Sequence, residues 1–135
     1  MQKINLRLMF VFIVTLLLIS PLAQARSAPL YNPEPISVPA GKSLEQVKTA
    51  IRSALLSRGW EGTAASANHI VGTLHVRKHT AVIDIHYDTK EIKISYKDSN
   101  QLNYEMKDNK PFIHPNYNGW IQKLEKDIRV KISDR

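Results

Sequence analysis

The chain has no cysteine among its 135 residues, and this absence excludes several classes of protein. Without a thiol it cannot carry the acyl group of a bacterial lipoprotein, a disulfide or a thiolate metal site. The longest apolar run, Leu8 to Ile19, is shorter than the ~20 residues that a membrane-spanning helix needs. The chain also lacks a basic stripe with interleaved aromatic residues, so we do not expect a nucleic-acid partner.

Residues 1–25 have the pattern of a signal peptide. Lys3 and Arg7 give a positive start, Pro21 breaks the apolar run, and Ala23-Gln24-Ala25 supplies the small residues that a signal peptidase recognises. We therefore expect an exported protein, periplasmic or secreted, that does not span the membrane after processing. The alternative is an uncleaved membrane anchor, for which the apolar run is short.

The remaining chain is basic. Removal of the leader with Lys3 and Arg7 leaves 17 basic against 12 acidic side chains, a net charge of +5. In an exported protein, this charge favours an anionic lipid surface, a glycan or an acidic envelope protein as partner. About 110 residues suffice for one domain with one core. We expect an extended, proline-rich tail over 26–41 and a single domain over 42–135.

Two helices are indicated by their apolar spacing. Over 43–58, Ser43 and Gln46 form a capping box and Gly59 suits the left-handed residue after the helix. A second helix begins at Pro115, with His114 before it. One face of each helix is apolar. The apolar positions are Leu44, Val47, Ala50, Ile51, Ala54 and Leu55 in the first helix, and Tyr117, Trp120, Ile121, Leu124 and Ile128 in the second.

Period-two alternation from Val71 to Lys97 predicts an antiparallel meander with one buried and one solvated face. A turn at Lys78-His79 would pair Leu74 with Ile83, and a turn at Thr89-Lys90 would pair Ile85 with Ile94. Neither turn has an Asn-Gly or Asp-Gly pair to fix it. Trp60 to Ala65 forms a weaker strand, and Gly62 and Gly72 indicate that a helix crosses closely there.

Residues 98–113 lose all periodicity and are predicted to form a long loop rich in turn formers. A short edge strand is possible at Ile36-Ser37-Val38. The sequence thus predicts an α+β fold, a two-layer sandwich in the order helix, antiparallel meander of three or four strands, helix. Both helices are expected on one face of the sheet.

Several short segments resemble a family of small exported bacterial proteins of uncharacterised function, many of them described as lipoproteins. These segments are Ser43-Leu44-Glu45-Gln46-Val47, Arg58-Gly59-Trp60, Tyr96-Lys97-Asp98-Ser99, Leu102, Tyr104, Ile113-His114, Tyr117-Asn118 and Trp120-Ile121. The resemblance implies export but no defined chemistry. This chain departs from the lipoprotein-like members because it lacks the acylated cysteine.

Aromatic and amide side chains cluster at the junction between 98–113 and the second helix. Aromatic faces beside amides hold sugars and peptides in many proteins. The candidate ligand-binding residues are Asn100, Tyr104, His114, Tyr117, Asn118 and Trp120. The alternative is that these rings belong to the core and anchor the loop. A second candidate surface is the open face of the sheet.

Catalytic and metal sites have weaker support. Asp98, Ser99 and His114 are the residue types of a nucleophilic triad, but no Gly-x-Ser-x-Gly elbow accompanies them. His75, Asp84 and His86 are residue types that bind zinc or copper, but the predicted register places the two rings roughly 13 Å apart. We therefore expect no metal, no cofactor and a binding or scaffolding domain, with a small hydrolase using Ser99 and His114 as the alternative.

Overall fold

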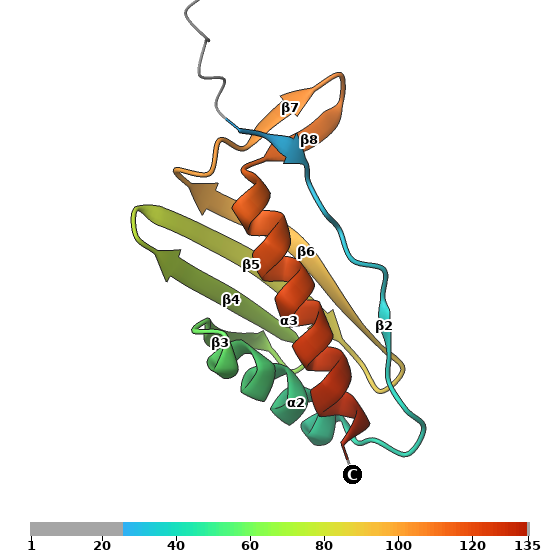
Figure 1. Ribbon diagram of the computed structural model, residues 1–135. Helices are drawn as coiled ribbons and strands as arrows, with labels where there is room; N and C mark the ends of the chain where they lie inside the picture. The colour runs from blue at the N-terminus through green and yellow to red at the C-terminus, as the bar shows by residue number, and fades with distance from the viewer. Residues whose placement is uncertain (1–25, 135) are drawn as a thin grey trace, which may run out of the picture.

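The computed structural model describes residues 26–134, so the predicted signal peptide lies outside the described residues. The described part consists of two helices and two antiparallel sheets, which confirms the predicted α+β sandwich. Both helices lie on the same face of the larger sheet (Figure 1). Neither helix is long and apolar enough to cross a membrane.

The larger sheet has five strands in the order β2-β6-β5-β4-β3. Their bounds are β2 Ile36–Ser37, β3 Glu61–Ser66, β4 His69–Val76, β5 His79–Tyr87 and β6 Glu91–Asn100. The predicted edge strand at Ile36 is confirmed as β2, which pairs antiparallel with β6. The sheet therefore extends beyond the predicted meander by one short strand at its β6 edge.

The helices are α2, Leu44–Ser57, and α3, Pro115–Ser133. Ser43 and Gln46 form the predicted capping box, and Gly59 has a φ of 79° after the end of α2. His114 caps α3, because its ring accepts a hydrogen bond from the backbone N–H of Asn116. Capping satisfies N–H groups that have no partner within the helix.

The core lies between the helices and the inner face of the sheet, as the apolar patterns predicted. Leu55 of α2 packs directly over two glycines of the strands. A Cβ on Gly62 would lie 3.0 Å from Leu55 Cδ1, and a Cβ on Gly72 would lie 3.3 Å from Leu55 Cδ2. The crossing helix that these glycines indicated is confirmed, because any side chain there would displace Leu55.

The register of the β5–β6 hairpin is confirmed, with Ile85 opposite Ile94. The predicted register of the β4–β5 hairpin is wrong by two residues. Leu74 lies opposite Ala81, and the turn is formed by Arg77 and Lys78. Arg77 adopts a φ of 55°, which is unusual for a residue other than glycine, asparagine or aspartate. The sequence therefore gives no sign that the turn lies there. A shift of two leaves every side chain on its predicted face.

The predicted loop over 98–113 is also wrong. β6 continues to Asn100, with Lys97 as an extra residue between the pairs Ile83–Tyr96 and Val82–Asp98. The rest forms a hairpin of β7, Glu105–Lys107, and β8, Lys110–Ile113. Asp108 and Asn109 make its turn with φ of 50° and 62°, a backbone conformation that Asp and Asn tolerate.

The proline-rich tail is extended, and it is joined to the domain by hydrogen bonds. β1, Ala28–Pro29, pairs with β8 and completes a three-stranded sheet beside the start of α3 (Figure 1). The Tyr31 hydroxyl donates to Glu125 Oε2 on α3 at 2.6 Å. The tail therefore belongs to the folded unit along most of its length.

Candidate functional site

The six residues of the predicted aromatic and amide site do not line one pocket. Tyr104 is exposed and stacks on Tyr96, with ring centroids 4.3 Å apart. Tyr117 is buried edge-on to Tyr96 at 5.8 Å, and burial raises the pKa of both Tyr96 and Tyr117. Tyr117 is therefore a core ring, the alternative that the sequence left open, whereas Tyr104 lies on the surface against Tyr96.

Of the other predicted residues, Asn118 and His114 form hydrogen bonds within the fold, and Asn100 lies at the end of a strand. The side chain of Asn118 accepts from the backbone N–H of Tyr31 at 2.8 Å and donates to the carbonyl of Pro29 at 2.9 Å. Asn118 thus anchors the tail to α3. His114 has a different role, since it caps α3. Asn100 is exposed at the end of β6, opposite Thr80 of β5.

The residues of the alternative hydrolase have other partners. The Ser99 hydroxyl and the Tyr96 hydroxyl share a hydrogen bond of 2.8 Å. The Nδ1 atom of His114 accepts from the backbone of α3 at 3.1 Å, and its ring lies 5.6 Å from that of His79. Among residues 26–134 no hydrogen bond joins Ser99 to His114, and a nucleophile needs such contact with its base.

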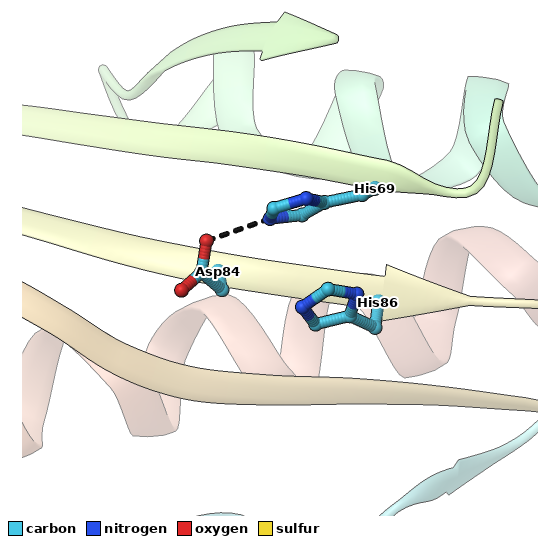
Figure 2. Close-up of side chains that lie close together, drawn as sticks. All are labelled: His69, Asp84 and His86. Atoms are coloured by element: carbon cyan, nitrogen blue, oxygen red, sulfur yellow. Dashed lines mark hydrogen bonds and ion pairs between the residues drawn. The ribbon is translucent and has the colours of Figure 1, made fainter. Parts of the chain in front are cut away.

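The open face of the sheet carries a cluster that the sequence prediction missed. The corrected β4–β5 register places His69 directly opposite His86, with Asp84 two residues away on the same strand. Figure 2 shows the three side chains together on the side of the sheet away from the helices. His69 Nε2 lies 2.6 Å from Asp84 Oδ1. His75, which the sequence prediction considered, lies opposite Thr80 and is farther from His86 than predicted, whereas the ring opposite His86 belongs to His69, which the prediction did not consider.

The helix-covered side holds a pocket of about 210 Å³ between the end of α2, strand β4 and α3. Its lining residues are Arg58, Trp60, Leu74, Val76, Trp120 and Lys123. Of the predicted ligand-binding residues, only Trp120 lines it. Trp60 is buried, Trp120 is half-buried, and Lys123 is exposed.

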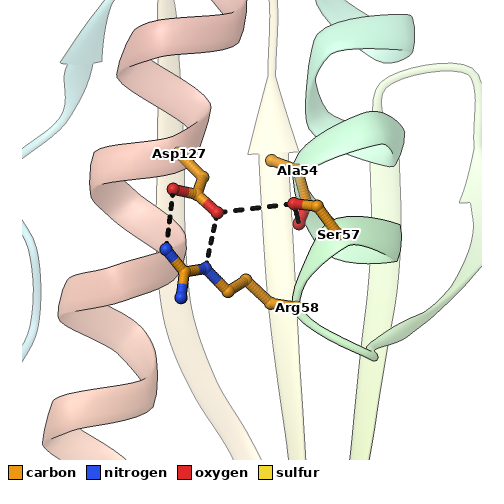
Figure 3. A network of polar contacts seen from close by, with 4 residues as sticks. All are labelled: Ala54, Ser57, Arg58 and Asp127. Carbon is orange, nitrogen blue, oxygen red and sulfur yellow. Dashed lines mark hydrogen bonds and ion pairs between the residues drawn. The ribbon is translucent and has the colours of Figure 1, made fainter.

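A salt bridge holds the cationic wall of this pocket in place. Arg58 donates from Nε and Nη2 to the two carboxylate oxygens of Asp127 on α3, at 2.6 and 3.1 Å (Figure 3). Ser57 also donates to the carbonyl of Ala54 at 2.8 Å. The two hydrogen bonds from Arg58 to Asp127 lower the pKa of Asp127 and raise the pKa of Arg58. The guanidinium thereby joins α2 to α3 beside the two indoles.

The pocket could not be located from the sequence, although part of its signal was visible. For Arg58 and Trp60, the sequence pattern predicts only the end of a helix and the start of a strand. Trp120 was found by its aromatic neighbours along the chain, whereas its pocket neighbours come from α2 and β4. The two tryptophans of the chain, 60 residues apart in sequence, line the same pocket only because α3 packs against the sheet.

Comparison with known proteins gives no match: no family model, curated protein or solved structure is similar to this chain.

Proposed function

We propose that the protein is an exported, non-enzymatic binding domain whose pocket between Trp60 and Trp120 holds the apolar, carboxylate-bearing end of an envelope peptide. The observation that carries the proposal is the composition of the pocket. Two indoles and two aliphatic side chains form its walls, and two cations accompany them.

The polar groups of the lining are all hydrogen-bond donors. Arg58 and Lys123 donate from charged nitrogens, and an indole donates from its ring N–H. A sugar presents hydroxyls that both donate and accept, and none of the lining side chains offers an acceptor. A carboxylate only accepts, so it matches the pocket, and a fixed guanidinium suits it particularly well.

The size of the pocket limits how much of a ligand it can hold. At about 210 Å³ it is smaller than the ~300–1,000 Å³ of pockets that enclose a whole drug-sized ligand. It fits the last residue of a chain, with the aliphatic side chain against Leu74 and Val76 and the carboxylate toward Arg58 and Lys123. The excess of basic residues in the part after the leader also favours an anionic ligand.

The test uses the intrinsic fluorescence of the protein, because both of its tryptophans line the pocket. The probes are acetyl-Ala-Ala-Leu as the free acid and the same peptide as its carboxamide. The free acid is expected to change the tryptophan emission in a saturable way, and the amide, which has the same apolar contacts without the charge, is expected to bind at least about tenfold more weakly.

Charge reversal on α3 supplies the matched control. Lys123→Glu should weaken binding of the free acid by about tenfold, because it places a like charge beside the carboxylate. Lys126→Glu makes the same change at an exposed position outside the pocket lining and should leave binding unaltered. Equal binding of acid and amide, no saturable change, or equal effects of the two variants would contradict the proposal.

A further inference from the structure

We infer that His69, Asp84 and His86 form a binding site for a divalent transition-metal ion, zinc or copper(II), on the open face of the sheet. This site goes beyond the peptide-binding function proposed above. It uses the opposite face of the sheet and shares no residue with the pocket.

The sheet itself brings the three ligands together. His69 and His86 are direct cross-strand neighbours on β4 and β5, and Asp84 lies one alternation along β5 on the same face. The two imidazole rings stack with centroids 4.0 Å apart and planes inclined by 20°. Paired strands fix side-chain positions better than a loop would, so the backbone already sets the spacing of the ligands.

The distances suit a single ion after small side-chain movements. One ligand atom from each of the three residues lies within 4.8 Å of the others. Ligands bound tetrahedrally at ~2.0–2.1 Å from zinc stand about 3.3 Å apart. His69 Nε2 and Asp84 Oδ1, now 2.6 Å apart, would separate slightly to admit the ion in place of their shared proton (Figure 2).

A simple ion pair does not account for the cluster. His69 and Asp84 form their contact without His86, and their side chains are only 21% and 18% exposed. His86 adds a second imidazole, stacked on the first and itself exposed. Two nitrogens and one carboxylate oxygen form a set found in metal sites that keep a position open.

Room for a further ligand lies next to His86. A hollow of about 170 Å³ borders it, lined also by Asn68, Glu91 and Lys93. Because His86 is exposed and borders this hollow, water can reach an ion held by the cluster and complete its coordination. One group disfavours metal binding. The ammonium of Lys97 lies 3.8 Å from Asp84 Oδ1 and repels a cation at the cluster.

The donor atoms narrow the choice of metal. The cluster contains no sulfur ligand, thiolate or thioether, so it lacks the soft donors that select copper(I). Imidazole nitrogen with carboxylate oxygen binds zinc, nickel and copper(II), with copper(II) the tightest of the three. We expect both zinc and copper(II) to bind, copper(II) more tightly.

The test is calorimetric titration of the purified protein with zinc chloride and with copper(II) chloride, in buffer free of chelating groups. One ion per chain is expected, with a rise in Tm on binding. His69→Gln and His86→Gln should each weaken binding by at least about tenfold, since loss of a mere supporting contact around a metal already costs ~10–100-fold. His75→Gln is the matched control, because His75 lies on the same strand and face and bonds to Thr80 instead.

Two further variants keep the result free of folding effects. Asp84→Asn preserves shape and hydrogen bonding but removes the charge, and should also weaken binding, whereas Lys97→Gln removes the opposing cation and should tighten it. The copper(II) complex should show coupling to two imidazole nitrogens in its electron paramagnetic resonance spectrum, and to one in His86→Gln. Absence of saturable binding by both ions, or equal loss in His75→Gln, would overturn the site.

Discussion

The two faces of strand β4 differ in what they carry. Its inward side chains include Leu74 and Val76, which pack under the helices and line the tryptophan pocket. Its outward side chains include His69 and His75, on the face that neither α2 nor α3 covers (Figure 1). The same eight residues thus supply an apolar wall on one side and His69, one of the three proposed metal ligands, on the other.

The difference shows which structural facts depend on parity and which on register. Whether a residue faces in or out depends only on alternation, so an error of two residues in the hairpin changed no assignment of face. Which residues are neighbours across the strands depends on the turn. His69 meets His86 only because Arg77 and Lys78, rather than Lys78 and His79, form that turn.

The largest expected effect comes from placing a lysine on the buried face of β5, compared with a lysine on its open face. Ile85 is fully buried, and Val82 is half-buried on the open face. Ile85→Lys should unfold the domain, because an unpaired buried charge costs several kcal/mol against a total stability of ~5–15 kcal/mol. Val82→Lys should cost less than about 1 kcal/mol. Thermal melting followed by circular dichroism measures both, and similar melts would refute the assignment of faces.

A smaller loss is expected at the point where α2 approaches the sheet. A Cβ on Gly72 would lie 3.1 Å from Ile83 Cγ1 as well as close to Leu55. Gly72→Val should therefore destabilise the domain by about 1–3 kcal/mol, the usual cost of overpacking. Thr73→Val, the next residue on the outward side, should change stability by about 0.5 kcal/mol or less. Urea denaturation compares the two, and an unaffected Gly72→Val would show that Leu55 does not press on the strand.

The smallest expected effect is dependent on pH and confined to the helix-covered side. Arg58 lowers the pKa of Asp127, so their contact stabilises the fold above the unfolded pKa of ~3.9 and is lost as the pH falls through the lower folded value. The Tm difference between wild type and Asp127→Asn should be constant at neutral pH and shrink in acid. A difference that grows on acidification would contradict the role of this pair.

Asp127→Asn also distinguishes the two faces. The variant should weaken binding of the free-acid peptide, because Arg58 loses the partner that holds it at the pocket. Metal binding on the open face should be unchanged, since the Arg58–Asp127 salt bridge shares no residue with the cluster of His69, Asp84 and His86.

The sequence predicted those parts of the fold that depend on local pattern. The capping box at Ser43, the apolar stripes of the helices, the pairing of Ile85 with Ile94 and the approach at Gly62 and Gly72 were all readable. The hairpin of β7 and β8 was missed although Asp108 and Asn109 suit its turn, because its short strands lack alternation.

The candidate sites were harder to predict because they depend on contacts between distant segments. Trp60 and Trp120 share a pocket only after α3 has packed on the sheet. His69 lies before the clearest part of the alternation and joins His86 only in the observed register. Neither the helix-mediated contact nor the positive φ of Arg77 is encoded in spacing along the chain.

The central claim is that β4 and β5 pair in the register that sets His69 opposite His86, and it is tested most directly by nuclear Overhauser effects between the backbone protons of the two strands. The structure predicts cross-strand contacts between His69 and His86 and between Gly72 and Ile83. Contacts between Gly72 and Ile85 would instead show the shifted pairing, separate the two histidines and contradict the metal site.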